Sequence, residues 1–414
     1  MITRVRGTED VLDLRLYNFM LDQIKHHLTV YNFHQIDTPI LEHTDLFVRA
    51  VGTETDIVSK EMYVFQTASG ESLCLRPEGT SSIIRAYVEN SVEQAPWKVF
   101  IHGPMFRHER PQKGRWRQFN QMSIEVINTP SIEQDVHFLK MLDTLFCDVL
   151  KLENSVLKLN FLGCSEDRKA HREALVAFLE TIKDSICAQC LVRKDKNTLR
   201  IFDCKNEECK KQYHQAPKIT DHLCATCAQE WQQLQTLLNV LSVSYVLDPT
   251  LVRGLDYYNK TVFEFVSRDL GSQDAFCGGG RYCLGKEMDA KTDLPSIGVG
   301  FGMGRMLMLV EKNLNKLTLP QEAALHIIIP FAAEQKQLAL LLAHELQANG
   351  LCVDVLLEEA SISNMMKRAN KMGAKFALII GPDEQQEGTV SIKNMLKGET
   401  TVVKQIEAAK FLKA

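Results

Sequence analysis

The sequence predicts an α+β protein: a mostly extended region, interrupted by a helical, cysteine-rich insertion and followed by a small α/β domain. The first observation is a pair of strand-like segments, 97–106 and 117–126, around a strongly charged loop, as in a long hairpin. The second is the change to helical, charged and cysteine-rich sequence over 165–242. The third is the alternation of short apolar runs with helical patterns beyond residue 322, which predicts a largely parallel sheet.

The remaining elements follow from the spacing of apolar residues. A first helix is expected over about 11–30, because its apolar side chains fall on one stripe at helical spacing. A glycine-rich stretch precedes a helix that begins near Phe301, and 313–321 is typical of a linker. Further strands are expected at 157–161, 243–247, 261–266, 325–329, 352–357 and 376–380. We therefore expect a main domain formed by 1–164 and 243–312, an inserted helical cysteine-rich subdomain at 165–242, and a C-terminal domain at 322–414.

Composition narrows the class of protein. The 414 residues are 45% apolar and 24% charged, as in a globular protein of more than one domain. No apolar run reaches the roughly 18 residues of a membrane span, and the charged N-terminus lacks the apolar core of a signal peptide, so we expect a cytoplasmic protein without a membrane partner. The net charge of −4 gives no bulk attraction to nucleic acid, so any RNA contact requires local basic patches.

The strongest chemical signal is the basic hairpin loop at 106–119. Arginine offers paired planar donors that match phosphate oxygens, and it keeps its charge. Several arginines beside Phe119 would suit a nucleotide, with the base stacked on the ring. A solvated charged loop is the alternative for this segment taken alone.

The segment from Gly103 to Glu125 resembles the second signature of class II aminoacyl-tRNA synthetases, in the form typical of the histidine enzyme, and the similarity extends from Arg6-Gly7 through the C-terminal domain. The resemblance implies a six-stranded, mainly antiparallel catalytic sheet in the main domain and an anticodon-binding domain at the C-terminus. It also implies site residues within the loop. Arg107 would grip the α-phosphate and the amino-acid carboxylate, Arg115 the outer phosphates, and Glu109 and Phe119 the adenine, while Arg110, Gln112 and Lys113 would face the acceptor end of tRNA.

A second candidate site is the turn at 75–80, where a carboxylate and a hydroxyl could bind a substrate ammonium group. By the resemblance, Glu78, Gly79 and Thr80 bind histidine. The alternative is that Glu78 caps a helix that starts near Ser81, since a carboxylate is favourable at a helix N-terminus.

The string Arg-Gly-Leu-Asp-Tyr-Tyr-Asn at 253–259 resembles the motif peculiar to histidyl enzymes. There Arg253, with Arg107, is implied as catalytic, because a fixed cation stabilises the charge that develops on the α-phosphate. Tyr257 and Tyr258 belong to the implied histidine pocket, in which Tyr258 and Glu125 each hydrogen-bond one imidazole nitrogen and Gln121 lies nearby. A buried Tyr-Tyr pair is the structural alternative.

Two glycine-rich strings resemble the family with departures. The string at 277–282 continues with Cys283 and Leu284, where the family usually has aspartate and glycine. The third class II signature appears at 298–305, where Arg305 would stack on adenine opposite Phe119 and reach the γ-phosphate. Gly304 replaces the preceding glutamate, which loosens the helix start by roughly 1 kcal/mol.

Six cysteines lie close together in the insertion. The pairs Cys187-x-x-Cys190 and Cys224-x-x-Cys227 could supply four thiolates to one structural Zn²⁺ ion, since each pair presents two ligands. The alternative is that these are buried free thiols. Cys204 and Cys209 lie between the pairs, without an assigned role.

Two further segments imply partners. Lys367, Arg368, Lys371 and Lys375 are on a helical segment that could meet anticodon-stem phosphates, although a solvated basic face is the alternative. The segment at 33–42 resembles the first class II signature, which forms the two-fold interface in the family, so a homodimer is implied.

The function implied by the resemblance is that of a histidine–tRNA ligase. L-Histidine would attack the α-phosphate of ATP, with Mg²⁺ bridging ATP oxygens, and the histidyl group of histidyl-AMP would pass to the 3′ end of tRNA(His). Two alternatives are a non-catalytic, histidine-sensing regulatory paralogue that binds a histidine-biosynthetic transferase, and an RNA-binding module without synthetase activity.

Overall fold

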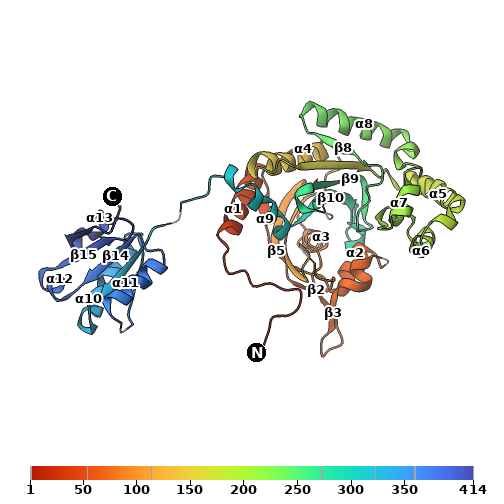
Figure 1. The fold of residues 1–414 in the computed structure, drawn as a ribbon. Coiled ribbons are helices and arrows are strands. Elements are labelled where there is room, and N and C mark those ends of the chain that lie inside the picture. Colours follow the sequence, from red (N-terminus) through yellow and green to blue (C-terminus); the bar gives the residue numbers. More distant parts are fainter. Residues whose placement is uncertain are drawn as a thin grey trace. The chain divides into compact units, whose positions relative to one another are not determined.

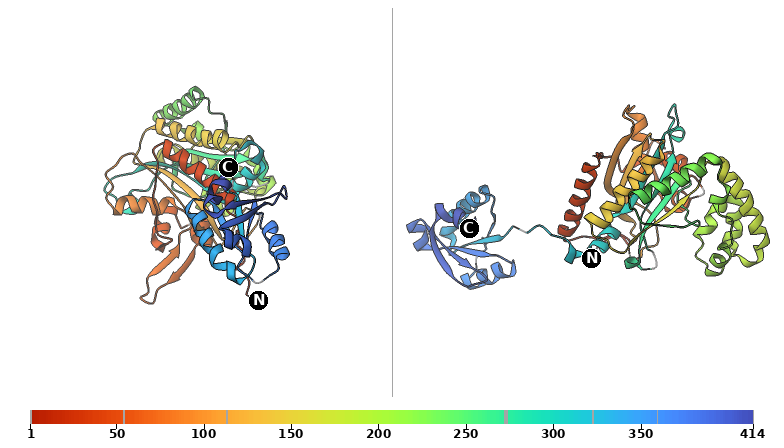
Figure 2. Two further views of the ribbon diagram at one scale, coloured as in Figure 1. Left: turned by 90° about the vertical axis from the view of Figure 1, so that its left-hand side faces the viewer. Right: turned by 90° about the horizontal axis from the view of Figure 1, so that it is seen from above.

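The computed structural model describes residues 2–53, 55–112, 114–271, 274–321, 323–358 and 360–413. The chain divides into two compact units, Met1–Thr318 and Leu319–Ala414, each of which is described by itself (Figures 1 and 2).

The first unit is built on an eight-stranded sheet of order β1-β5-β6-β11-β10-β9-β7-β8. Its six central strands, β5 to β7 in this order, pair with one another antiparallel, as the family resemblance implied, and β1 and β8 add parallel strands at the two edges. The strands are β1 (His34–Gln35), β5 (Trp97–Phe106), β6 (Gln118–Ile127), β7 (Ser155–Phe161), β8 (Tyr245–Leu247), β9 (Tyr258–Ser267), β10 (Ala275–Cys283) and β11 (Pro295–Gly302). A separate three-stranded sheet has the order β2-β4-β3, with β2 (Leu41–His43), β3 (Tyr63–Gln66) and β4 (Ser72–Leu75).

Helices cover both faces of the large sheet, because side chains alternate between the faces along each strand (Figure 1). Phe100 and Phe263 face one core together with α1, α4, α8 and α9. Ile101 and Val262 face the other core with α2 and α3. The covering helices are α1 (Arg15–Val30), α2 (Thr44–Val51), α3 (Thr80–Glu89), α4 (Ile132–Asp143) and α9 (Met303–Lys312), with short turns η1 (Ile57–Glu61), η2 (Thr144–Val149), η6 (Arg268–Leu270), η7 (Lys286–Met288) and η8 (Leu314–Lys316).

The first helix begins at Arg15, later than expected. The carboxylate of Asp13 accepts a hydrogen bond of 3.0 Å from the backbone N–H of Arg15, which satisfies one of the free donors at this helix end. Val11 and Leu14 stay outside the helix and line the cavity described below.

A helical insertion connects β7 to β8. It has its own small core, which includes Leu175, Leu179 and Ile201, while α8 packs on the main sheet's helices. Its elements are α5 (Ser165–Thr181), η3 (Lys183–Ser185), α6 (Ala188–Lys196), η4 (Thr198–Asp203), α7 (Glu207–Tyr213), η5 (Ile219–His222) and α8 (Ala225–Val240).

The second unit is a five-stranded sheet of order β13-β12-β14-β15-β16 with helices packed on it. The sheet was expected to be largely parallel, but only β13, β12 and β14 are parallel, whereas β15 and β16 run antiparallel. The connections are too short for a parallel crossover, which needs a dozen or more residues. The elements are β12 (Leu325–Pro330), η9 (Ala333–Gln335), α10 (Lys336–Ala348), β13 (Cys352–Val355), α11 (Ile362–Lys371), β14 (Phe376–Ile380), α12 (Pro382–Glu387), β15 (Thr389–Asn394), β16 (Thr400–Lys404), η10 (Gln405–Glu407) and α13 (Ala408–Lys413).

Candidate active site

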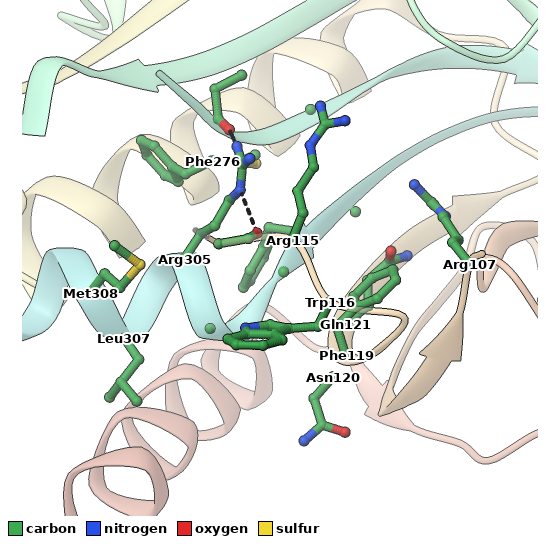
Figure 3. A pocket seen from close by; sticks show the side chains of 18 of the residues that line it. Arg107, Arg115, Trp116, Phe119, Asn120, Gln121, Phe276, Arg305, Leu307 and Met308 are labelled. Atoms are coloured by element: carbon green, nitrogen blue, oxygen red, sulfur yellow. Dashed lines mark hydrogen bonds between the residues drawn. The ribbon is translucent and has the colours of Figure 1, made fainter. Parts of the chain in front are cut away.

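A cavity of about 940 Å³ lies in the first unit, against β6, β9, β10, β11 and the start of α9. Four arginines from distant parts of the sequence line it: Arg107, Arg115, Arg253 and Arg305. Figure 3 shows three of them, Arg107, Arg115 and Arg305, around the same space as Phe119 and Trp116. The sheet therefore brings together the cations that the sequence singled out separately.

Each arginine is held by a defined partner. Arg107 donates from Nε to the backbone oxygen of Pro77 at 2.9 Å, and its guanidinium lies 5.4 Å from the centre of the Phe119 ring. Arg305 donates from Nε to the backbone oxygen of Gly114 at 3.1 Å, which joins α9 to the basic hairpin. Such fixed positions allow the cations to act without reorganisation.

Within the hairpin, Arg115 and Glu109 form an ion pair of 3.0 Å, so the carboxylate expected to meet adenine faces a cation in this structure. Gln112 and Arg115 pair across the tip through backbone hydrogen bonds of 3.2 and 2.9 Å. Arg110 and Gln112 are exposed, as a tRNA contact requires, and Lys113 lies outside the described residues.

The N-terminal segment closes the base of the hairpin. The backbone oxygen of Gly7 accepts a hydrogen bond of 2.7 Å from Arg117. Gly7 has a φ of +88°, and a Cβ there would approach Arg117 and Pro111 to within 2.9 Å, so glycine is required.

Arg253 lines the same cavity and pairs with Glu264 of β9. Its guanidinium is 5.8 Å from the centre of the Tyr258 ring, and its Nε is buried without a hydrogen-bond partner among the described residues. Burial is the largest influence on this group and opposes its charge, but Glu264 together with Tyr258, Cys277 and Tyr257 raises the pKa of Arg253 above its usual value. Glu264 was not predicted as a site residue. Its position between Phe263 and Phe265, which face the core, is the sequence signal that it points to the other face.

The turn before α3 supports the structural alternative for Glu78. Its carboxylate accepts hydrogen bonds from the backbone N–H groups of Thr80 at 2.6 Å and Ser81 at 2.8 Å, so it caps the helix. Glu78 and Thr80 also line the cavity, so capping and substrate binding are compatible. Gly79, expected in the histidine pocket, packs against Ser123 and Ile101, and a Cβ there would lie 2.5 Å from the hydroxyl of Ser123 and 2.7 Å from Cδ1 of Ile101.

Glu125 is fully buried behind the cavity wall and is not one of its lining residues. Its two oxygens accept hydrogen bonds from the hydroxyls of Thr80 at 2.6 Å and Tyr282 at 2.7 Å. Glu125, expected to hydrogen-bond the imidazole, thus contacts the cavity lining through Thr80, and Tyr282 is a partner that the sequence did not identify. Burial raises the pKa of Glu125 to about 8 despite these hydrogen bonds.

Gln121, Tyr257 and Tyr258 add polar and aromatic side chains to the lining of the cavity. Gln121 donates to the hydroxyl of Ser123 at 2.8 Å, and the rings of Tyr257 and Tyr258 are 4.6 Å apart. Burial raises the pKa of Tyr258, so its hydroxyl is a neutral hydrogen-bonding group at neutral pH.

The cysteine pairs form two groups, so the set of Cys187, Cys190, Cys224 and Cys227 expected to share one ion was wrong. The first pair joins Cys204 and Cys209, and the second joins Cys164 and Asp167; within each group the ligand atoms lie within 4.8 Å of one another. The reason is that each pair starts a different helix, α6 or α8, which packs against a different part of the insertion.

Among the described residues, no helix has the length and apolar character needed to cross a bilayer.

An antiparallel sheet that carries a hairpin of arginines, with a further arginine at the start of the helix after β11, defines a class II aminoacyl-tRNA synthetase.

Comparison with known proteins identifies the family within that class. The model of the histidyl-tRNA synthetase family matches residues 8–305, and that of an anticodon binding domain matches 326–414. The histidine–tRNA ligase of Caldanaerobacter subterraneus subsp. tengcongensis is 39% identical over 100% of both chains, and that of Solidesulfovibrio magneticus is 40% identical over 98% of this chain and 95% of the relative. The crystal structure of apo histidyl-tRNA synthetase from S. aureus aligns with a TM-score of 0.82 and 31% identity over 100% of both chains.

The chain belongs to the histidyl-tRNA synthetase family, and its enzymatic function is that of a histidine–tRNA ligase. The full-length ligase relatives and the C-terminal anticodon binding domain support this function over that of a regulatory paralogue.

Proposed function

We propose that the cavity is the site at which ATP activates L-histidine to histidyl-AMP, before the histidyl group passes to the 3′ end of tRNA(His). The observation that carries this proposal is the convergence of four arginines on one cavity that Gln121, Tyr257 and Tyr258 also line. Guanidinium groups match phosphate oxygens, and these polar side chains match an imidazole ring.

In this proposal, Arg253 and Arg107 hold the α-phosphate from two sides, and they stabilise the charge that develops when the histidine carboxylate attacks. Arg115 and Arg305 hold the outer phosphates, while Phe119 and Arg305 enclose the adenine. The acid partners of two arginines support this assignment, because the phosphate oxygens of ATP would replace Glu264 at Arg253 and Glu109 at Arg115. Mg²⁺ would neutralise further charge on ATP, and the carboxylates of Glu109 and Glu264 are oxygen donors that would hold it.

Histidine would bind through its ammonium group to Glu78 and Thr80, and through its ring to Tyr258 and Gln121. Glu125 would act through Thr80, to which it is hydrogen-bonded. An isostere without ring nitrogens would leave these buried polar groups unpaired, which is the basis for specificity.

The transfer step requires the acceptor end of tRNA at the same cavity. The exposed hairpin residues Arg110 and Gln112, with Lys113 beside them in the sequence, are the groups that we assign to this contact. Phosphate contacts would fix the position of the RNA, while polar side chains read it.

The test is histidine-dependent exchange of pyrophosphate into ATP, with all twenty amino acids compared. We expect histidine alone to support exchange. Arg253→Ala should lower the rate by at least about a hundredfold while ATP binding is partly retained, because the cation acts on the transition state. Arg49→Ala, which removes an exposed ion pair with Asp289, is the control. Equal exchange by Arg253→Ala and the wild type would contradict the assigned role.

We also propose that the enzyme is a cytoplasmic homodimer. All twelve cysteines are free, which suits a reducing compartment.

The dimer is supported by apolar side chains that are exposed around the sheet β2-β4-β3: Ile40 (41%), Leu41 (46%), Val64 (50%) and Phe65 (44%). Analytical ultracentrifugation should give a molecular mass twice that of one chain, which is 47.0 kDa. Phe65→Asp should shift the equilibrium between dimer and monomer toward the monomer. Val246→Asp, on the exposed strand β8, is the control and should leave this equilibrium unchanged. A monomeric wild type would contradict the proposal.

A further inference from the structure

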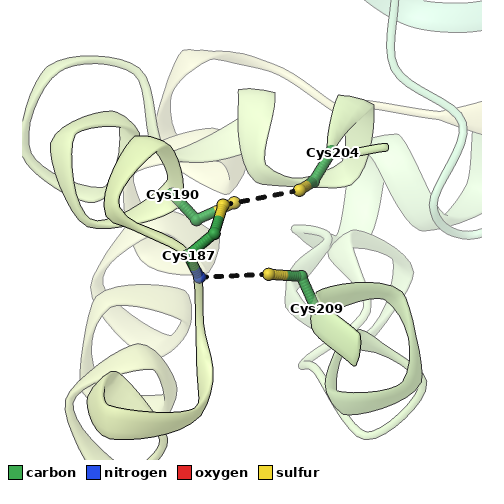
Figure 4. Close-up of side chains that lie close together, drawn as sticks. All are labelled: Cys187, Cys190, Cys204 and Cys209. Atoms are coloured by element: carbon green, nitrogen blue, oxygen red, sulfur yellow. Dashed lines mark hydrogen bonds between the residues drawn. The ribbon is translucent and has the colours of Figure 1, made fainter. Parts of the chain in front are cut away.

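Four cysteines of the insertion are arranged around one point (Figure 4). The sulfur atoms of Cys187, Cys190, Cys204 and Cys209 all lie within 4.8 Å of one another, and those of Cys187 and Cys204 are 3.8 Å apart. Four sulfurs at the Zn–S distance of about 2.3 Å in a tetrahedron are about 3.8 Å from one another. A disulfide would require about 2.05 Å. The spacing therefore suits a shared metal ion.

The surroundings of this cluster suit thiolates. The backbone N–H of Cys187 donates to the sulfur of Cys209 at 3.2 Å, and that of Asn206 donates to the sulfur of Cys204 at 3.4 Å. Backbone donors of this kind orient and stabilise metal-bound sulfur. The hydroxyl of Tyr213, which packs in the same small core, is buried without a hydrogen-bond partner among the described residues. The cluster thus offers four thiol ligands and a further donor beside them.

The second group, Cys164, Asp167, Cys224 and Cys227, differs because its carboxylate already has hydrogen-bond partners. The carboxylate of Asp167 accepts hydrogen bonds from the backbone N–H groups of Cys164 at 3.0 Å and Cys224 at 2.8 Å, so it already links the starts of α5 and α8. Cys224 is exposed. This group therefore provides a matched comparison for the first one.

The first cluster is connected to the candidate active site by the segment between Cys190 and Cys204. Arg200 of η4 donates to the backbone oxygen of Gly254 at 2.7 Å and to the carboxylate of Asp256 at 2.9 Å. Asn197, just before η4, donates to the same carboxylate at 3.0 Å. Gly254 and Asp256 belong to the loop that begins at Arg253, so Arg200 and Asn197 hold that loop through hydrogen bonds.

We propose that Cys187, Cys190, Cys204 and Cys209 bind one structural Zn²⁺ ion, and that this ion fixes η4 so that Arg200 positions the loop carrying Arg253. The zinc site stands on the cluster alone. The positioning role of Arg200 rests on the proposed function of the cavity.

The zinc site is tested by metal analysis of the purified full-length enzyme. We expect about one equivalent of zinc with four sulfur ligands at about 2.3 Å in X-ray absorption. Cys204→Ser should lose the zinc, whereas Cys224→Ser should keep it. Less than about a tenth of an equivalent in the wild type, or loss of zinc only in Cys224→Ser, would overturn the assignment. The wild-type measurement decides even where a variant folds poorly.

The positioning role is tested by combining zinc removal with Arg200→Ala. Arg200→Ala should keep its zinc and lower kcat for histidine-dependent exchange by about tenfold with little change in KM, because misplacement of a catalytic cation affects the chemical step. Arg200→Lys should recover part of the loss, and Lys211→Ala on α7 is the control.

Chelation of zinc should lower the rate of the wild type by a similar factor and that of Arg200→Ala by much less, since both changes act on one contact. Equal effects of chelation in the two proteins would refute the connection. If the wild type showed no histidine-dependent exchange, the proposed function would fail, while the zinc content would still decide the metal site.

Discussion

At the scale of single residues, the cavity balances its own charges. Arg253 faces Glu264, and Arg115 faces Glu109, so two of its cations have a carboxylate partner. Removal of one member of a buried pair leaves an uncompensated charge, which costs more than the pair contributes. The acids therefore keep the arginines in place for a ligand that brings its own negative charge.

Glu125 gives a pH-dependent prediction, because burial raises its pKa from an ordinary 4.5 to about 8. Between these values the folded protein holds a proton that the unfolded chain has lost. The stabilisation is therefore complete below about 4.5 and is lost as the pH rises to about 8, by up to about 1.4 kcal/mol per pH unit. Glu125→Gln removes this dependence.

We would measure thermal unfolding of Glu125→Gln and of the wild type between about pH 5.5 and about pH 8.5. As the pH increases, the melting temperature of the variant should rise relative to that of the wild type. The exposed Glu93→Gln serves as the control. A difference between Glu125→Gln and wild type that stays constant across this range would mean that Glu125 titrates normally.

The chemistry of single residues explains which site residues the sequence could identify and which it could not. The arginines could be identified because a guanidinium suits phosphate wherever the fold places it. The partners of Arg253 and Glu125, namely Glu264 and Tyr282, depend on which strands are neighbours, and one chain does not reveal this. The grouping of the cysteines was missed for the same reason: Cys204 and Cys209 approach Cys187 only after α6, η4 and α7 have folded together.

At the scale of elements, the hairpin pattern around the charged loop predicted β5 over its full length, Trp97–Phe106, and short apolar runs predicted the three parallel strands of the second unit. It did not predict the hairpin of β15 and β16, whose pattern is weaker because much of β16 is exposed. Nor did it predict that the glycine run at 278–280 forms the middle of a central strand. Glycine usually weakens strands, and here it makes room for side chains that reach in from neighbouring elements.

Gly278 illustrates that requirement. A Cβ at this position would overlap the guanidinium of Arg253, whereas one at Gly302 of the neighbouring strand would meet nothing within 4 Å. We expect Gly278→Ala to lower histidine-dependent exchange by about a hundredfold by displacing Arg253. Gly302→Ala, also at the cavity, should stay within about twofold. Kinetic measurement of both variants, with circular dichroism as a check on folding, makes the comparison. Similar activities would mean that Arg253 has space to move.

At the scale of the whole molecule, the chain consists of two units with separate hydrophobic cores. The cavity belongs to the first unit. In the second, Lys367, Arg368 and Lys371 lie on α11, and Arg368 pairs with Glu358 at 2.8 Å. Residues 326–414 match an anticodon binding domain, as the resemblance implied, and the contact of the basic residues of α11 with RNA stays a prediction.

This division predicts that the two steps of the reaction can be separated. A protein of residues 1–318 has the whole cavity and both cores of the first unit, so it should fold and support histidine-dependent exchange within about threefold of the full chain. Charging of tRNA(His) should fall by about a hundredfold, because the phosphate contacts of the second unit are lost. Charging at an undiminished rate by residues 1–318 would show that the second unit contributes no recognition, and loss of exchange would show that the first unit depends on the second for its structure.

A single lysine of the second unit should show the same phosphate contact in the full chain. Lys371→Ala should weaken tRNA binding and reduce the slope of log K against log salt concentration by about 1, because one phosphate contact is lost. Lys413→Ala on α13 should leave both the affinity and the slope unchanged.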